Sequence, residues 1–186
     1  MIKAINLYFL TSLIIGDAAW AKDPYVDIDT TMCRAGETIY ISCALDGGPD
    51  EHDYDGPVAS ICAKNNVSPE SGYVQYRYGL PVDGRQAQKL EMQFPEKKKP
   101  PKEKFKIYES DNLESVAVAL RFTNGKYTYS FESYGLGGYK VVARERNREV
   151  FSKSCTLPGV NYLVDKAYQG IERINFDQQK ILDTNE

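Results

Sequence analysis

Residues 72–79, with the sequence GYVQYRYG, give the clearest secondary-structure signal in the chain. Aromatic side chains recur at every second or third position between two glycines, and this alternation is typical of a β-strand. One face of the strand carries Val74, Tyr76 and Tyr78, and the other carries Tyr73, Gln75 and Arg77. The stretch therefore predicts a strand with two chemically different faces. Such a strand favours a β-rich fold for the segments around it.

Several other segments share this pattern and are joined by short turns. We expect strands over residues 38–43, 58–63, 89–94, 116–122, 126–134, 139–143 and 149–151, and a helix over 161–174. Short links favour antiparallel pairing, and the chain shows no βαβ alternation. The predicted fold is mainly β, an antiparallel sandwich or partly open barrel of about eight strands with one C-terminal helix. Residues 22–177 form this single domain, and residues 178–186 form a flexible tail.

Composition narrows the classes of function. The 186 residues carry a formal net charge of −3 and include 14 Tyr and 7 Phe. Mild acidity excludes a strongly basic nucleic-acid binder, so we expect no nucleic-acid partner. His52 is the single histidine of the sequence, which excludes mechanisms that need two. We expect no cofactor and no resident metal.

The first 21 residues have the features of a secretory signal peptide. Lys3 supplies a positive charge, residues 4–16 are mostly apolar, and Ala19-Trp20-Ala21 is a small-x-small cleavage site. An uncleaved membrane anchor is the alternative, but the apolar run is shorter than the roughly 20 residues that a spanning helix needs. We therefore expect a periplasmic protein with no stable membrane insertion after cleavage.

All four cysteines follow this segment, at Cys33, Cys43, Cys62 and Cys155. An even number of cysteines in an exported chain predicts two disulfides, with three possible pairings. A zinc site is the alternative, although no Cys-x-x-Cys pair is present. A hairpin that turns within residues 46–57 can place Cys43 opposite Cys62, which would leave Cys33 for Cys155. That register puts Ile61 on the opposite face from Ile39 and Ile41, so a shifted register, or a sheet covered on both faces, stays open.

These strands resemble a largely uncharacterised family of small secreted proteins of Gram-negative bacteria. In that family a Cys-bounded hairpin, similar to residues 41–63 here, precedes a Tyr-x-Gln-Tyr-Arg-Tyr-Gly strand and then an apolar strand ending in Pro, as at Pro95. The resemblance covers roughly residues 33–165. It implies a periplasmic location and a β-fold, and it implies no catalytic residue. The loops at 46–57 and 95–106 look longer than is usual in the family.

The loop at 46–57 is rich in acids and turn-forming residues. Its acids include Asp50, Glu51, Asp53 and Asp55. Alternating carboxylates are typical of calcium loops, but the EF-hand pattern of glycine and glutamate is absent. A hydrolase that used His52 as a general base would need a nucleophile, for which Ser60 and Ser71 are available outside any nucleophile motif. A solvated acidic loop is the simpler interpretation.

The loop at 95–106 carries six Lys against two Glu. We expect an extended, solvated segment that either aids solubility or binds phosphate headgroups or an acidic partner. Arg77 would either stack between Tyr73 and an aromatic side chain of a neighbouring strand or present its guanidinium to a carboxylate of a partner. The candidate partner-binding residues are Asp50, Glu51, Asp53, Asp55, Tyr73, Arg77, Lys97, Lys98, Lys99 and Lys102.

These features lead to a hypothesis of function. Oppositely charged loops on a disulfide-stapled β-scaffold suit a non-enzymatic periplasmic binding or inhibitor protein. The hypothesis is an immunity protein that blocks a periplasm-acting toxin, such as a lipase or cell-wall hydrolase delivered by a type VI secretion system. The alternative is a secreted hydrolase or calcium-binding protein that uses residues 46–57. A ligand-carrying barrel is disfavoured because its interior would be filled by aromatic side chains.

Overall fold

A computed structural model describes residues 30–45, 56–81, 89–110, 117–134, 138–156 and 162–175. These residues form ten strands and one short helix. The elements are β1 (Thr38–Ala44), β2 (Val58–Lys64), β3 (Tyr73–Leu80), β4 (Lys89–Phe94), β5 (Phe105–Glu109), β6 (Val118–Asn124), β7 (Tyr127–Ser133), β8 (Tyr139–Glu145), β9 (Arg148–Ser154), α1 (Asp165–Gly170) and β10 (Glu172–Asn175).

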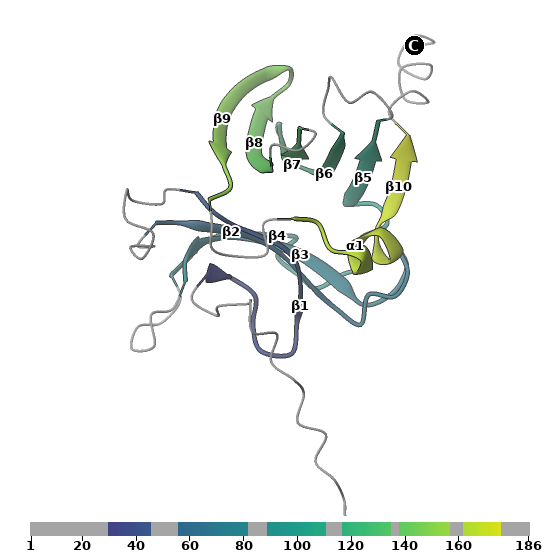
Figure 1. Ribbon diagram of the computed structural model, residues 1–186. Helices are drawn as coiled ribbons and strands as arrows, with labels where there is room; N and C mark the ends of the chain where they lie inside the picture. The colour runs from purple at the N-terminus through teal and green to yellow at the C-terminus, as the bar shows by residue number, and fades with distance from the viewer. Residues whose placement is uncertain are drawn as a thin grey trace, which may run out of the picture.

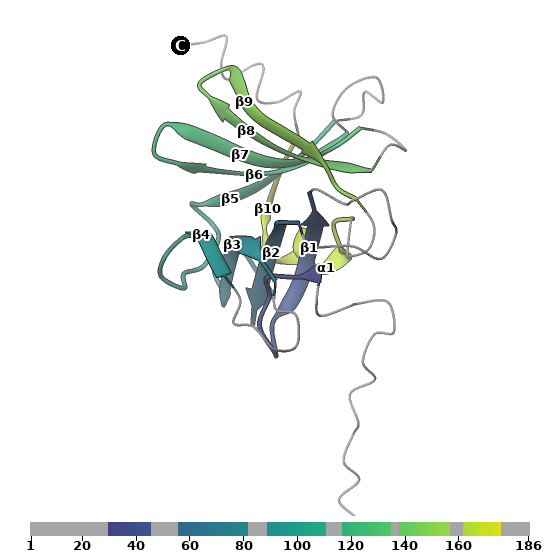
Figure 2. The ribbon, with the colours of Figure 1, turned by 90° about the vertical axis from the view of Figure 1, so that its left-hand side faces the viewer.

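The strands build two sheets. The four-stranded sheet has the order β1-β2-β3-β4, and the six-stranded sheet has the order β10-β5-β6-β7-β8-β9. Figure 1 shows the six-stranded sheet standing over the four-stranded sheet, with the strands of the two sheets running in different directions. Figure 2, turned by 90°, shows the same two layers and places α1 beside β1. The predicted mainly β sandwich with disulfide staples is confirmed.

Aromatic rings fill the space between the sheets. Tyr76, from the apolar face of β3, lies 5.0 Å from the ring of Phe122 and 6.1 Å from that of Phe131, measured between centroids. Phe94 of β4 stacks on Phe122 at 5.0 Å, and Phe122 also stacks on Tyr129. Side chains that alternate along single strands therefore meet across the layers, and burial of their apolar area stabilises the sandwich.

The C-terminal region differs from the prediction of one helix over 161–174. Leu163, Ala167 and Ile171 are buried, as the helical spacing predicts, but α1 ends at Gly170 and Ile171 is already extended. A Cβ on Gly170 would lie 2.0 Å from Asn66 Oδ1, so only glycine allows this close approach. The chain then continues as β10, which pairs with β5 in parallel, against the expectation of antiparallel pairing throughout.

Strand β5 lies partly inside the segment that the sequence predicts to be a solvated loop. Phe105 and Ile107 are fully buried, whereas Lys106 between them is half-buried. Two apolar positions are enough to add a strand when a long neighbour, here β6, offers a free edge for pairing. Because lysines surround these two apolar positions, the sequence pattern does not indicate a strand here.

All four cysteines are oxidised, so the predicted disulfides are confirmed and the zinc alternative is wrong. The bonds are Cys33–Cys62 and Cys43–Cys155, and the pairing expected from a hairpin that turns within residues 46–57 is therefore also wrong. The cause is the register of β1 on β2, which differs from the expected one along the whole strand pair. Cys43 consequently lies opposite Ala59 and faces the core, where Cys155 reaches it from the end of β9.

The two disulfides are consistent with an extracellular or periplasmic protein, because such bonds persist in oxidising compartments. Among the described residues, no helix is long and apolar enough to cross a membrane. The predicted signal peptide at 1–21, the acids of residues 46–55 and the tail at 178–186 lie outside the described residues.

Removal of either disulfide should destabilise the protein by an amount that follows the length of the loop it closes. The sequence separations are 29 residues for Cys33–Cys62 and 112 for Cys43–Cys155. Loop-closure entropy gives about 3–4 kcal/mol for the first pair and about 4–5 kcal/mol for the second. Urea unfolding of the two double-alanine variants measures both values. A non-reducing peptide map that linked Cys43 to Cys62 would contradict the assigned pairing.

Candidate binding site

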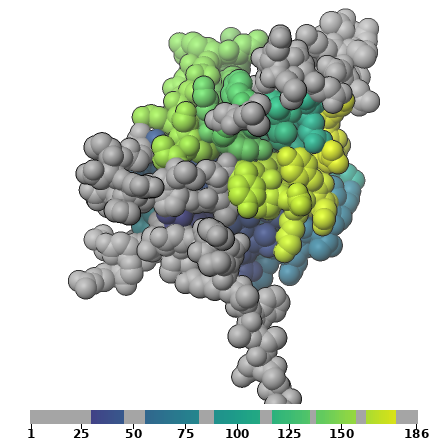
Figure 3. Space-filling view, viewed as in Figure 1, coloured from purple at the N-terminus to yellow at the C-terminus, as the bar shows by residue number. Residues whose placement is uncertain are grey.

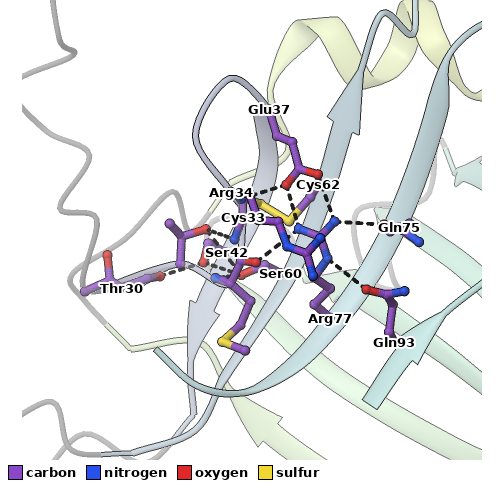
Figure 4. The surroundings of a disulfide bond; sticks show 12 residues. Thr30, Cys33, Arg34, Glu37, Ser42, Ser60, Cys62, Gln75, Arg77 and Gln93 are labelled. Atoms are coloured by element: carbon purple, nitrogen blue, oxygen red, sulfur yellow. Dashed lines mark hydrogen bonds and ion pairs between the residues drawn. A yellow bond between two sulfur atoms is a disulfide. The ribbon is translucent and has the colours of Figure 1, made fainter. Parts of the chain in front are cut away.

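The outer face of the four-stranded sheet carries a buried polar layer under residues 30–37. Ser42 Oγ donates a hydrogen bond to the carbonyl oxygen of Thr30 at 2.6 Å and lies 2.8 Å from Ser60 Oγ. The backbone N–H of Met32 donates to Ser60 Oγ at 3.0 Å. Figure 4 shows this layer beside the Cys33–Cys62 disulfide. The sheet is therefore covered on both faces, which is one of the two alternatives that the sequence leaves open.

Arg77 lies at the centre of this layer, and its side chain is 0% exposed. Its guanidinium forms a two-point ion pair with Glu37, at 2.6 Å for Nη1–Oε2 and 2.8 Å for Nη2–Oε1. The other three N–H groups donate to the Met32 carbonyl, Gln75 Oε1 and Gln93 Oε1. All five guanidinium donors are thus satisfied, as a buried arginine requires.

Arg77 therefore has a structural role. Its contacts differ from both predicted roles, which were stacking on an aromatic ring and presenting the guanidinium to a partner. Its partner is Glu37, a carboxylate 40 residues away in the sequence that is not among the predicted site residues. A signal for Glu37 does exist in retrospect. A charged residue in the middle of a four-stranded sheet needs a counter-charge, and Glu37 follows closely after Cys33, which the disulfide fixes to β2.

Two opposing effects set the pKa of Glu37. Burial alone would raise the pKa, but hydrogen bonds from Arg77, from the Arg34 backbone N–H and from the Tyr73 hydroxyl outweigh burial and lower it to about 2. The carboxylate therefore stays ionised far below neutral pH. Its side chain is 2% exposed, so this interaction is protected from solvent screening.

Tyr73 connects this layer to the lysine loop, residues 95–104 between β4 and β5. Its hydroxyl donates to Glu37 Oε1 at 2.7 Å, and the ammonium of Lys98 lies 4.6 Å from the centre of its ring. Tyr73 is only 9% exposed. It serves as a platform for Lys98 through a cation–π contact and offers little surface of its own to a partner.

The backbone of the lysine loop is held to the sheet near both ends. The Gln75 side-chain amide donates to the Pro95 carbonyl at 2.9 Å, and that of Gln93 donates to the Glu96 carbonyl at 2.9 Å. At the far end, the backbone N–H of Lys102 donates to the Pro69 carbonyl at 3.0 Å. The expectation of exposed lysines is correct, but the loop is ordered against the sheet where the sequence suggests a free, extended segment.

These contacts bring four basic segments to the same side of the sheet. The segments are Arg34, Lys64, residues 97–99 and residues 102–104. Lys64 is the strand partner of Tyr73, and a Cβ on Gly36 would lie 3.7 Å from its ammonium. We name the resulting set the lysine surface. It comprises Arg34, Lys64, Lys97, Lys98, Lys99, Lys102 and Lys104, all of which are exposed.

Few acids neutralise the lysine surface. Within the described ranges, Lys102 is the one member in a side-chain ion pair, with Glu70 at 2.9 Å. Both partners of that pair are more than half exposed, so the pair adds little stability. The remaining cations face solvent, which leaves a local positive field on a protein whose net charge is −3.

The other candidate residues fall into two groups. Asp50, Glu51, Asp53, Asp55 and His52 lie outside the described residues. Of the possible nucleophiles, Ser60 is fully buried in the hydroxyl layer, whereas Ser71 closes a turn with Ser68.

One group of possible metal ligands occurs in the described part of the chain, at Cys33, Glu37 and Cys62. The two sulfur atoms are joined in the disulfide, and both oxygens of Glu37 accept hydrogen bonds from Arg77. The group therefore offers no free ligand set, and it carries no metal-site hypothesis.

Comparison of the chain with models of protein families, with curated proteins and with solved structures finds no match in any of the three.

Substitution Glu37→Gln should destabilise the protein by about 3 kcal/mol at pH 7, because it leaves the Arg77 charge buried without its counter-ion. The folded pKa of about 2 lies below the ordinary value of 4.5. The stability from this group is therefore present above pH 4.5 and is lost as the pH falls toward 2. Urea unfolding at several pH values should show a smaller loss over this window in the variant. Glu70→Gln, in the exposed pair, is the matched control and should unfold like the parent protein.

Substitution Gln75→Leu should loosen the lysine loop while leaving the core intact. Gln75 is 1% exposed, and its side-chain amide links the Pro95 carbonyl to the Arg77 guanidinium. We expect faster backbone hydrogen exchange over residues 96–104 and a loss of about 1–3 kcal/mol in stability from the unpaired buried groups. Unchanged exchange in that range would show that the loop is ordered by other contacts.

Proposed function

We propose that the protein is a non-enzymatic binding protein of the periplasm that inhibits another protein, acting as an immunity protein against a toxin delivered there. The observation that carries the proposal is the lysine surface, a set of exposed cations on an ordered backbone of which Lys102 alone forms a side-chain ion pair among the described residues. The target is a lipase or cell-wall hydrolase, such as a type VI secretion effector, and the lysine surface binds an acidic region beside its cleft. Steric occlusion of that cleft then blocks the substrate.

The order of the lysine loop supports this proposal. Binding costs free energy when a loop must be immobilised on contact. Here Gln75, Gln93 and the Tyr73–Lys98 contact hold the loop before any partner arrives. A preordered loop therefore retains more of its interaction energy as affinity, which is the property required of an inhibitor.

The charge of the surface supports a protein partner of opposite sign. Exposed charges contribute more to the rate of association and to specificity than to affinity. Lys97 and Lys99 form no ion pair within the described residues, so they are available to attract acids of a partner. The proposal consequently requires an association rate that falls with ionic strength.

The buried acids support a non-enzymatic role. Glu37 and Glu132 are the buried carboxylates of the described residues whose pKa is lowered against the effect of burial, by Arg77 and Arg144 respectively. Both are held by arginines in ion pairs. A general acid or base needs a pKa near the working pH, and neither carboxylate offers one.

The test uses purified secreted lipases and cell-wall hydrolases encoded beside the gene for this protein. Biolayer interferometry should detect binding of at least one of them, and an activity assay should show its inhibition. The double variant Lys97→Glu/Lys99→Glu should slow association by about tenfold at low salt, since two charges change sign. The control Lys126→Glu/Lys140→Glu makes the same charge change on the six-stranded sheet and should leave the rate unchanged.

Two outcomes would contradict the proposal. Binding that is equally sensitive to both double variants would show a response to net charge and not to the lysine surface. Failure to bind or inhibit any of the co-encoded enzymes would remove the immunity function itself.

A further inference from the structure

The turn between β2 and β3 exposes an apolar side chain and buries a polar one. This β2–β3 turn comprises residues 65–72. Val67 is 79% exposed, the largest value among the large apolar side chains of the described residues, whereas Asn66 beside it is 9% exposed. Figure 3 shows blue residues of the four-stranded sheet at the surface, directly against the yellow-green residues of α1. A single apolar side chain on a surface is common, so the argument depends on how the turn holds it.

Hydrogen bonds from inside the turn fix its backbone. The Asn66 side-chain amide donates to three carbonyl oxygens, those of Ser68 at 2.8 Å, Ser71 at 2.9 Å and Gly170 at 3.0 Å. Ser71 Oγ accepts the backbone N–H of Val67 at 3.0 Å and that of Ser68 at 2.9 Å. The polar side chains of the turn therefore bond inward, and Val67 is left as the group that it presents to solvent.

The two ends of the turn are fixed as well. Asn65 and Gly72 both have positive φ, at 53° and 60°. A Cβ on Gly72 would lie 2.2 Å from the carbonyl oxygen of Lys64, so only glycine fits there. Val67 is consequently held in one position before any partner arrives, and little free energy is spent on ordering the turn when it binds.

The β2–β3 turn adjoins the lysine surface. The backbone N–H of Lys102 donates to the Pro69 carbonyl at 3.0 Å, and the Lys102 ammonium pairs with Glu70 at 2.9 Å. Lys64, another member of the lysine surface, directly precedes the turn. A target that contacts the lysine surface can therefore meet the turn in the same complex.

We propose that the β2–β3 turn is the segment that enters the cleft of the target, with Val67 as its anchor, and that the target is a lipase. The inference rests on the proposed function, and it narrows the target to one class of enzyme. The turn occupies the space of an acyl chain, while the lysine surface binds acids at the rim of the cleft.

The chemistry of the turn favours a lipase over a cell-wall hydrolase. A lipase cleft is apolar because it holds acyl chains, and Val67 gains free energy by leaving water there. A cleft for glycan or peptide carries polar groups that need partners. The side chains of Asn66, Ser68 and Ser71 already bond within the protein, so the turn would leave such groups unsatisfied, which is costly.

A second copy of the chain is a poor occupant for this surface. A two-fold contact through the turn would bring the same patch of each copy together. The lysine surface of one copy would then face that of the other, and like charges at short range repel. The charge of the surface therefore also favours a different protein as the partner.

The test uses the purified lipases and cell-wall hydrolases encoded beside the gene. The protein should bind a lipase and inhibit it in competition with an ester substrate, so that KM rises and kcat is unchanged. Val67→Ala should weaken binding about tenfold, mainly through faster dissociation. Val150→Ala is the matched control, because it makes the same truncation at a valine of β9 that is 46% exposed, and it should bind like the parent protein.

A second measurement locates the contact on the target. A lipase whose active-site serine has been blocked with a long-chain alkylphosphonate has its acyl site filled, and it should no longer bind the protein. Urea unfolding of Val67→Ala should match the parent protein, because the side chain is exposed.

Three results would overturn the inference and leave the proposed function standing. Val67→Ala may not bind like the parent protein, the blocked lipase may not bind like the free one, and a cell-wall hydrolase may not be inhibited where no lipase is. Failure to bind any co-encoded enzyme would remove both the proposed function and the inference.

Discussion

The ion pair between Arg77 and Glu37 is the contact on which the outer half of the four-stranded sheet depends. A guanidinium withdrawn from water needs an acceptor for every N–H group and a counter-charge. Here these acceptors come from residues 30–37, from β3 and from β4, so one side chain ties three segments together. The Cys33–Cys62 disulfide attaches residues 30–37 to β2, and the ion pair fixes how this segment lies on the sheet. Burial of a charged group thus specifies one arrangement of a segment that has no regular secondary structure.

The lysine surface is an extension of this buried layer. Tyr73 contacts Glu37 through its hydroxyl and Lys98 through its ring, and Gln75 contacts both Arg77 and the Pro95 carbonyl. Any movement of the lysine loop would therefore break contacts that also satisfy buried polar groups, which raises the cost of that movement. The strand that gives the chain its clearest sequence pattern supports the lysine surface on one side and the aromatic core on the other.

Much of the fold follows from local patterns, because alternation along each strand reports which side chains face the core. Tyr76 and Phe131 are examples, and both lie between the sheets. The disulfide pairing does not follow, because it depends on the register of β1 on β2 and on how one sheet packs over the other. For the site, the sequence identifies the lysines and Arg77, but the counter-ion Glu37 is brought there by tertiary contacts. The distribution of charged residues along the sequence predicts which side chains are exposed. It does not predict that the backbone of the lysine loop is held against the sheet.

The order of the cysteines has a consequence for how the chain matures. The first pairs with the third and the second with the fourth, so neither native bond joins neighbours in the sequence. A thiol oxidised as the chain emerges from its N-terminus would meet the adjacent cysteine first, which is the wrong partner in both cases. Reaching the native pairing then requires attack of a free thiolate on the incorrect bond, a reaction that takes minutes to hours without help. Efficient production of this protein is therefore expected to depend on a thiol–disulfide isomerase, and a host that supplies only an oxidase would accumulate scrambled chains.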